Sequence, residues 1–416
     1  MERRPLSFQP GETLSVEGRD GHSLYFEVLG PLGAGGTGVV YESLSDEGEL
    51  AVIKGPRFVG EVDPALAGEL ELLEALPEHP NLIRLLGKLR DPRGHHLIVL
   101  ERAHEDPLLR LNRPEVRTRL RGFKSTGGRL AALPPAVALE LAYELALALE
   151  HLHAHKVAHC DVKPDNLLLR LPGAGRAPED RDYFEAVAKG EWRGVLIDLG
   201  GARSFRDLTR AYTGQGPPPA FTPLYTPPEV LPGSWDEQSG RERSRFSPWM
   251  DVYAFGLTLY QLLTGHVPYQ HLPAPPDLGD LHAVAEVKRE ERDGGLRPVT
   301  RSAFEGIDWS DVRVAGEGDP IPRLTEDLWR LVSHTLHYDP ARRPNLRRLA
   351  ADLAALLGVE PHDGPRGWRQ ARVVLDRFSS RLTAAGKDGT VQAPDIKKIR
   401  RGGADFWERE GYRPTR

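Results

Sequence analysis

The sequence of 416 residues contains one cysteine, Cys160. A single cysteine cannot form a disulfide within the chain or build a zinc site from thiolates. No stretch approaches the roughly 18 consecutive apolar residues that a membrane-spanning helix needs. The first residues also lack the apolar core of a signal peptide. We therefore expect a soluble protein of the reducing cytoplasm that has no contact with a membrane.

Lysine is scarce as well, because arginine supplies 45 of the 55 basic residues. Where a position needs only positive charge, this chain uses arginine, so its few lysines indicate places that need a compact ammonium group. Lys54 and Lys163 are the two that lie within candidate motifs. The net charge of −5 gives no general attraction to nucleic acid, which we do not expect as a partner.

Residues 157–168 combine a carboxylate, an ammonium group and an amide within six positions, from Asp161 to Asn166. This combination suits phosphoryl transfer. Asp161 can hold and deprotonate an incoming hydroxyl, Lys163 can balance negative charge, and Asn166 can provide a metal ligand. Pro164 cannot donate a backbone hydrogen bond, so we predict an ordered loop here rather than a strand.

A glycine pattern, G-x-G-x-x-G, occurs at Gly33, Gly35 and Gly38. Such glycines let a backbone approach a polyphosphate closely, although in a chain with 43 glycines the pattern also fits an ordinary hairpin turn. An apolar strand then ends at Lys54, which can neutralise phosphate charge or can be a solvated strand end. Glu69 follows on a predicted helix, from which it can reach back to Lys54 as an ion pair.

Asp198 follows the apolar strand 195–197 and precedes two glycines. This pattern suits a metal site, although an ordinary strand-to-turn aspartate fits it too. The nearly all-apolar helix expected over 249–264 belongs in the core, so Asp251 near its start needs backbone donors as partners. Between these elements we expect residues 202–228 to form a long loop with seven hydroxyl groups.

The remaining patterns predict a sheet followed by helices. Strands are expected at 14–16 and 24–26 (an opening hairpin), 49–54, 82–89, 95–100, 167–169 and 195–197. Helices are expected at 64–76, 136–155, 249–264, 279–292, 325–337 and 345–358. A further amphipathic helix is expected in the tail, over 368–382. The insertions 104–133 and 172–193 receive no role.

Taken in order, these motifs resemble those of eukaryotic-like serine/threonine protein kinases. The resemblance runs from about Tyr25 to Leu357. It implies an α+β, bilobal protein kinase-like fold, with a small antiparallel β-sheet lobe that carries one helix and a larger, mainly α-helical lobe. The chain would then comprise an N-terminal extension (1–23), a kinase domain (24–358, divided into lobes at 101/102) and a C-terminal extension (359–416).

The resemblance also implies ATP and Mg2+ as cofactors. The implied ATP-binding positions are Gly33, Gly35, Gly38, Val40, Ala51, Lys54, Glu69, Glu101, Ala103 and Leu168. The glycines would cover the phosphates, and Lys54, locked by Glu69, would hold them. Val40, Ala51 and Leu168 would enclose the adenine, while the backbone of Glu101 and Ala103 would meet its edge, after Leu100 as gatekeeper.

The resemblance further implies that Asp161 is the catalytic base, Lys163 the charge stabiliser, and Asn166 and Asp198 the magnesium ligands. By the same resemblance Glu229 should pair with Arg343, and Asp251 should anchor the loop that carries Asp161. The residues Leu73, Leu85, His159 and Leu199 are expected to stack as a hydrophobic spine. Three positions depart from the family pattern: Leu199, Pro227 and Cys160. Cys160 replaces the arginine that often receives an activation-loop phosphate.

The function that this resemblance implies is ATP- and Mg2+-dependent transfer of the γ-phosphate to serine or threonine of protein substrates. Lys163, two residues after Asp161, is the serine/threonine form of the loop. A small-molecule kinase and a pseudokinase scaffold are the alternatives. The long segment that closes at Glu229 argues against the first, and the presence of Lys54, Asp161 and Asp198 argues against the second.

Overall fold

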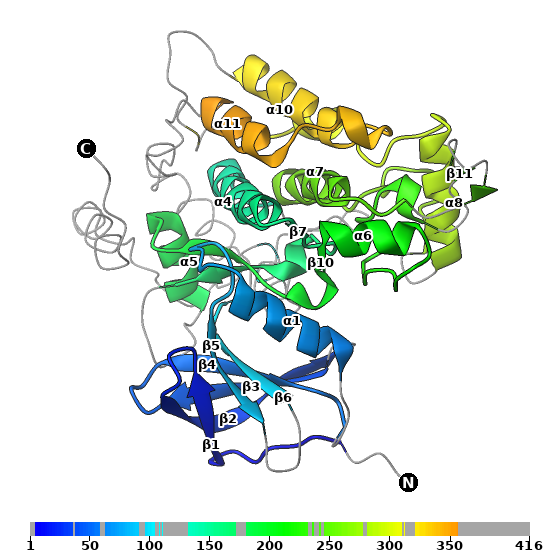
Figure 1. Cartoon of the computed structure of the whole chain (residues 1–416). Coiled ribbons are helices and arrows are strands. Elements are labelled where there is room, and N and C mark those ends of the chain that lie inside the picture. The colour runs from blue at the N-terminus through cyan, green and yellow to red at the C-terminus, as the bar shows by residue number, and fades with distance from the viewer. Residues whose placement is uncertain are drawn as a thin grey trace.

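The computed structural model describes most of the chain up to residue 356. The described residues are 5–35, 38–58, 63–90, 96–104, 108, 110, 132–171, 180–231, 235–236, 241–242, 245–277, 281–309, 312 and 321–356. The helix expected over 368–382 and most of the insertion 104–133 lie outside them. Figure 1 shows an antiparallel sheet at one end, helices at the other, and helix α1 (Pro64–Ala75) between the two.

The sheet is a closed barrel with the strand order β1-β2-β3-β4-β6-β5. Its strands are β1 (Thr13–Gly18), β2 (Ser23–Gly35), β3 (Gly38–Ser45), β4 (Leu50–Gly55), β5 (Leu85–Arg90) and β6 (His96–Glu101). Alternate side chains of these strands, such as Phe26, Val28 and Ile53, meet in one apolar cluster. The opening hairpin is confirmed, with Leu14 opposite Phe26.

Residues before the boundary expected at residue 24 belong to this sheet. β1 closes the barrel because Glu17 and Gly18 pair with Lys88 and Gly87 of β5. A side chain at Gly87 would lie 2.8 Å from the Glu17 carbonyl, so only glycine permits this approach. The sequence predicted the local hairpin but not this closure, which joins strands far apart in the chain.

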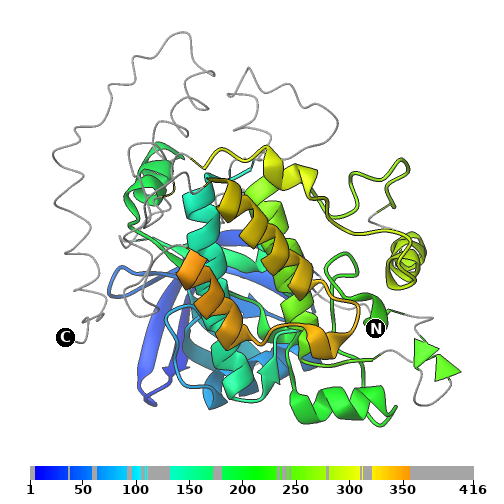
Figure 2. The same ribbon diagram turned by 90° about the horizontal axis from the view of Figure 1, so that it is seen from above.

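The helical region packs its helices around α7. Its helices are α4 (Pro135–Ala154), α5 (Asp180–Lys189), α6 (Phe205–Tyr212), α7 (Trp249–Thr264), α8 (Leu281–Arg292), α9 (Ser302–Glu305), α10 (Ile321–Thr335) and α11 (Leu346–Leu356). Figure 2 shows α4 and α11 side by side, and α7 contacts both α4 and α10. α7 is buried all round, as its nearly all-apolar sequence predicted. Among the described residues, no helix is both long and apolar enough to cross a membrane.

Short strand pairs and single turns connect these helices. The pairs are β7 (Val157–Ala158) with β10 (Arg203–Ser204), β8 (Leu167–Arg170) with β9 (Arg193–Leu196), and β11 (Trp235–Asp236) with β12 (Arg241–Glu242). The 3-10 turns are η1 (Pro164–Asn166), η2 (Leu199–Gly201), η3 (Pro228–Val230) and η4 (Pro340–Arg342). The turn η1 lies in the segment predicted as an ordered loop.

The prediction of a loop over 202–228 is wrong in part, because this segment contains helix α6. The Ser204 hydroxyl caps this helix by accepting the Asp207 N–H at 3.1 Å. Leu208 is 1% exposed on its inner face, with Phe205 packed beside it. A helix of eight residues with one short apolar face gives little periodic signal, so the many hydroxyls and prolines of the segment outweighed it.

The close approach of α7 and α10 depends on Gly256. A side chain there would place its Cβ 1.9 Å from Thr335 Oγ1. We expect Gly256→Ala to lower the free energy of unfolding by about 1–3 kcal/mol, because the helices must move apart. Urea denaturation measures this change. Gly68 in α1, which has open space around it, is the matched control, and Gly68→Ala should stabilise by about 0.5–1 kcal/mol. Equal effects of the two changes would contradict this account of the α7–α10 contact.

Candidate active site

The loop after β7 is fixed by one buried carboxylate. Asp251 of α7 is fully buried and accepts the backbone N–H groups of His159 and Cys160, each at 2.8 Å. Its Oδ2 also contacts Nε2 of His153 at 2.8 Å. Cys160 has a left-handed backbone (φ 69°), which is unfavourable for a residue with a side chain. The Asp251 contacts hold this conformation, so the predicted anchoring role of Asp251 agrees with the geometry.

Asp161, Lys163 and Asn166 lie together, as their spacing predicted. Lys163 Nζ donates to Asp161 Oδ2 at 2.7 Å, and Asn166 Nδ2 donates to the Asp161 carbonyl at 2.8 Å. A residue that the sequence did not single out completes the group. The Thr222 N–H donates to Asp161 Oδ1, and Lys163 Nζ donates to the Thr222 hydroxyl, both at 2.7 Å. These four residues form one hydrogen-bonded unit with the Asp161 carboxylate at its centre.

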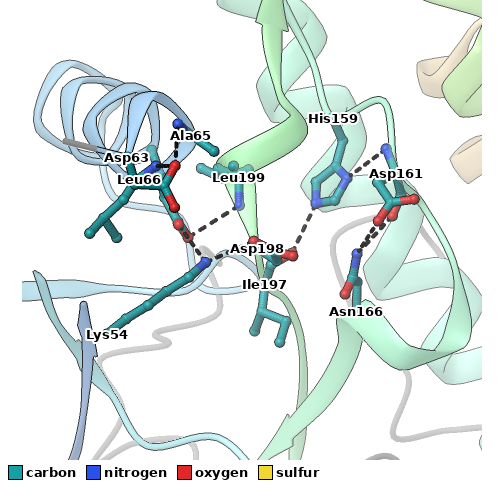
Figure 3. A network of polar contacts seen from close by, with 12 residues as sticks. Lys54, Asp63, Ala65, Leu66, His159, Asp161, Asn166, Ile197, Asp198 and Leu199 are labelled. Carbon is teal, nitrogen blue, oxygen red and sulfur yellow. Dashed lines mark hydrogen bonds and ion pairs between the residues drawn. The ribbon is translucent and has the colours of Figure 1, made fainter. Parts of the chain in front are cut away.

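A second polar group joins the sheet to the helical region. Lys54 of β4 donates to Glu69 Oε2 of α1 at 2.6 Å and to Asp198 Oδ1 at 2.8 Å (Figure 3). The predicted ion pair between Lys54 and Glu69 is therefore present. Burial lowers the pKa of Lys54, but the two carboxylates outweigh it and the net direction is upward. Burial likewise raises the pKa of Asp198, and Lys54 reverses this so that the carboxyl stays ionised.

Local structure orients the side chains of this second group. The Asp63 side chain caps α1 by accepting the Ala65 N–H at 2.8 Å, which fixes the start of the helix that carries Glu69. Glu69 Oε1 in turn accepts the Leu199 N–H at 3.3 Å. Asp198 has a left-handed backbone (φ 64°) at the start of η2. Glu69 thus contacts both Lys54 and the segment that carries Asp198.

His159 connects the two polar groups. Its ring Nε2 contacts the Ile197 carbonyl at 2.9 Å, and its Nδ1 accepts the Asp161 N–H at 3.3 Å (Figure 3). The side chain is fully buried, as expected for the spine. The other three members, Leu73, Leu85 and Leu199, belong to one buried cluster. His159 therefore sets the position of Asp161 relative to the strand that delivers Asp198.

The remaining predicted ATP-binding positions lie on the strands around Lys54. Gly33 pairs with Val40 and Gly35 with Gly38 in the β2–β3 hairpin, and Val40 also pairs with Lys54. A Cβ at Gly38 (φ 120°) would lie 2.1 Å from the Gly55 carbonyl, so the fold itself requires glycine here.

The positions expected around the adenine lie near the end of β6. Ala51 is fully buried and pairs with Glu101, Ala103 is buried just after β6, and Leu168 lies half-buried in β8. The carboxylate of Glu101 accepts the Arg84 N–H at 3.0 Å and pairs with Arg170. The side chain of Glu101 therefore bonds to the residue just before β5 and to β8.

The donor atoms of Asn166 and Asp198 suit a hard cation. The amide nitrogen of Asn166 is used by Asp161, which leaves the amide oxygen for other contacts. Asp198 supplies a carboxylate, and Mg2+ held with a nucleotide needs only one or two carboxylates beside the phosphates. In the described part of the chain, no group of three or more His, Cys, Asp or Glu side chains is placed to hold a metal by itself. The residues present fit Mg2+ bound together with phosphate oxygens.

The ion pair expected between Glu229 and Arg343 is present. Arg343 donates to both carboxylate oxygens of Glu229, at 2.7 and 3.0 Å. Its Nε donates to the His337 carbonyl at 2.9 Å, and Nη1 donates to the Trp249 carbonyl at 3.2 Å. This buried guanidinium joins η3, the start of α7 and the α10–α11 connection. The pair therefore fixes the C-terminal end of the segment that contains Thr222.

Comparison with known proteins agrees with this arrangement. The family model described as "Protein kinase domain" matches residues 26–353. The chain belongs to the protein kinase family. Membership confirms the resemblance found in the order of the motifs and implies the bilobal kinase fold.

Curated relatives include several kinases. Over 260 residues the chain is 30% identical to mitogen-activated protein kinase kinase kinase 10 of Homo sapiens, which covers 61% of this chain and 22% of that protein. It is 27% identical over 355 residues to mitogen-activated protein kinase kinase kinase 11 of Rattus norvegicus (82% and 33%). It is 25% identical over 334 residues to cell division control protein 2 homolog D of Antirrhinum majus (78% and 91%). The chain thus spans 22% to 33% of the length of the first two.

In this kinase, Cys160 stands at the position where related kinases often have a phosphate-binding arginine. An apolar cluster surrounds it. Cys160 is buried with Leu208 of α6, Val230 and Met250, and Phe205 packs against them. Burial, together with Asp251, raises the pKa of the Cys160 thiol far above its ordinary value, so it carries no charge at neutral pH. Helix α6 is therefore held over the Asp161 loop by apolar contacts.

We expect Leu208→Ala to loosen α6, because it leaves a cavity beside Cys160. Amide exchange of residues 205–212 should become at least tenfold faster, which corresponds to about 1.4 kcal/mol of local stability. The matched control is Thr209→Ala in the same helix. Thr209 is exposed, and its hydroxyl donates to the Phe205 carbonyl one turn earlier at 3.0 Å. Equal exchange in both variants would show that the cluster does not hold the helix.

Proposed function

We propose that this chain is an ATP- and Mg2+-dependent kinase that transfers the γ-phosphate to serine or threonine hydroxyls of protein substrates. The observation that carries the proposal is the pair of polar groups connected by His159. One contains the Asp161 carboxylate with Lys163 and Asn166, and the other contains Lys54 with Glu69 and Asp198. The first suits handling of a hydroxyl, and the second suits binding of a charged polyphosphate.

The roles of the chain's own residues follow from their atoms. Bound ATP with Mg2+ supplies the phosphoryl group and part of the charge neutralisation. Asp161 would orient the substrate hydroxyl and accept its proton as the hydroxyl oxygen bonds to the γ-phosphorus. The bond between that phosphorus and the β–γ bridging oxygen would break, and ADP would leave. Lys163, held by Asp161 and Thr222, balances charge on the transferred group. Lys54, held by Glu69, would orient the phosphates, and Asn166 and Asp198 would hold the metal.

Preference for serine and threonine is supported by Thr222. Its N–H and hydroxyl contact Asp161 and Lys163 directly, so the backbone after residue 221 lies against the proposed base. A substrate segment bound along this backbone would bring a short hydroxyl side chain to Asp161. The Glu229–Arg343 pair, which fixes the far end of the segment, favours a peptide substrate over a small molecule. The intact set of Lys54, Asp161 and Asp198 favours an enzyme over a pseudokinase scaffold.

Substitution of the two key carboxylates tests the proposal. Asp161→Asn and Asp198→Asn should each lower the rate of phosphate transfer to a generic protein substrate by roughly 10²–10⁴-fold or more. Lys54→Arg should also fail, because a planar guanidinium cannot make the two short contacts of a point ammonium. Asp165→Asn is the matched control, since Asp165 is an exposed acid in the same loop. Near-normal activity of Asp161→Asn would contradict the assigned role.

We further expect activity not to depend on phosphorylation of residues 202–228. Cys160 offers no cation to a phosphate, and apolar contacts already hold α6. Initial rates should agree within twofold for untreated protein, phosphatase-treated protein and a Thr209/Thr213→Ala variant. Ser204 is left intact in that variant because its hydroxyl caps α6. A tenfold fall, roughly 1.4 kcal/mol of transition-state stabilisation, would show that another cation performs the missing arginine's role.

A further inference from the structure

A cavity of about 730 Å³ lies where the sheet, the α1–β5 connection and the β8–β9 pair meet. Its lining includes Glu101 at the end of β6. The lining does not include Lys54, Asp161 or Asp198, so this cavity is separate from the catalytic groups of the candidate active site. Its volume lies within the roughly 300–1,000 Å³ typical of small-molecule sites.

The lining joins an apolar wall to a charged wall that is rich in arginine. Leucines from the end of α1 and the connection that follows, including Leu76 and Leu82, supply the apolar wall. The charged residues of the lining are Arg19, Arg84, Arg102, Arg170, Arg193, Glu49, Glu78 and Glu101. Three of the arginines already have carboxylate partners: Arg19 pairs with Glu78, Arg170 with Glu101, and Arg102 with Glu42, which lies outside the lining. Burial lowers the pKa of both lining histidines, His79 and His104, to about 4, so they add no charge at neutral pH.

Two side chains in the lining, buried His104 and partly buried Arg170, have buried polar atoms that no described residue satisfies. His104 is 7% exposed, and neither of its ring nitrogens has a hydrogen-bond partner. Arg170 donates through its Nη atoms to the Pro80 carbonyl and to Glu101, but its buried Nε has no partner. Leaving such groups unpaired costs about 1–3 kcal/mol each, so a bound group that pairs them is favoured.

A second cation of the lining, Arg84, is only weakly held. The side chain of Arg84 is 47% exposed, and among the described residues its guanidinium makes one contact, Nε to Glu101 at 3.7 Å. Its remaining N–H groups can therefore turn to a ligand without breaking a short hydrogen bond. Arginine also recognises carboxylate, sulfonate and phosphate groups by paired hydrogen bonds, which a lysine cannot do. The lining contains no lysine.

We propose that this cavity binds a small organic anion, namely a molecule that carries a carboxylate, sulfonate or phosphate group on an apolar body. The anionic group would accept hydrogen bonds from Arg84, from Arg170 Nε and from the N–H of neutral His104. The apolar body would lie against the leucine wall. The proposal does not rest on the kinase function, because none of these three residues has a catalytic role.

The probe is 8-anilinonaphthalene-1-sulfonate, an apolar body with one sulfonate, titrated by fluorescence into the full chain. A saturating non-hydrolysable ATP analogue with Mg2+ is present throughout to block the nucleotide site. N-phenyl-1-naphthylamine, which has the same body without the sulfonate, is the matched ligand. We expect one sulfonate probe per chain, bound at least tenfold more tightly than the uncharged compound.

Arg84→Gln and His104→Leu should each weaken the sulfonate probe at least fivefold, about 1 kcal/mol, and leave the uncharged compound unaffected. The matched protein control is Arg348→Gln, an exposed arginine of α11 paired with Asp352, which should change nothing. Melting temperatures confirm that the variants fold. Equal binding of the two compounds, or no binding of the sulfonate probe while the nucleotide analogue is present, would overturn the proposal. So would unchanged probe affinity in both cavity variants.

Discussion

The arrangement of the site depends on the buried carboxylate of Asp251. This side chain belongs to α7, the most enclosed helix of the described structure, and it accepts two N–H groups from the loop that carries Asp161. A buried carboxylate without such donors would be strongly destabilising, and a left-handed Cys160 without such an acceptor would relax. Each group therefore requires the other. The position of Asp161 therefore depends on how α7 is packed, because α7 carries Asp251. That packing includes the close approach of Gly256 to Thr335.

The sequence predicted those parts of the site in which the chemistry of a side chain already indicates its partner, such as a basic residue that needs an acidic one. The Lys54–Glu69 pair was predicted from charge and position, and the Glu229–Arg343 pair was implied by the resemblance to protein kinases; both are present. What it did not predict depends on contacts between distant segments. Barrel closure needs the Glu17 carbonyl against Gly87, and Thr222 reaches Asp161 across 61 positions. No local pattern encodes such meetings, since each partner taken alone fits an ordinary turn or loop.

Because lysine is scarce, each enclosed lysine is of interest. Besides Lys54 and Lys163, the structure encloses a third one, Lys288. Lys288 of α8 is 1% exposed and lies over the rings of Tyr253 and Tyr269, at 5.0 and 5.1 Å. Both tyrosine hydroxyls donate to Glu291, one turn further along α8. Burial lowers the pKa of Lys288 to about 8, while Glu291 opposes this change. The enclosed lysines among the described residues lie against carboxylates or aromatic rings, whereas arginine supplies 45 of the chain's 55 basic residues.

The contact between α6 and Cys160 has a different physical basis from a phosphate–arginine contact. Charge-assisted hydrogen bonds to a phosphate form only after modification and weaken with salt. Packing of Leu208 and Phe205 in the cluster with Cys160 needs no modification and is not weakened by electrostatic screening. A guanidinium within the apolar cluster would have to give up hydration, which disfavours it there. In this chain the uncharged Cys160 instead packs with the apolar face of α6, and the Phe205 N–H donates to the Lys156 carbonyl at 2.8 Å. Packing and backbone bonds therefore order the start of this segment without a phosphate.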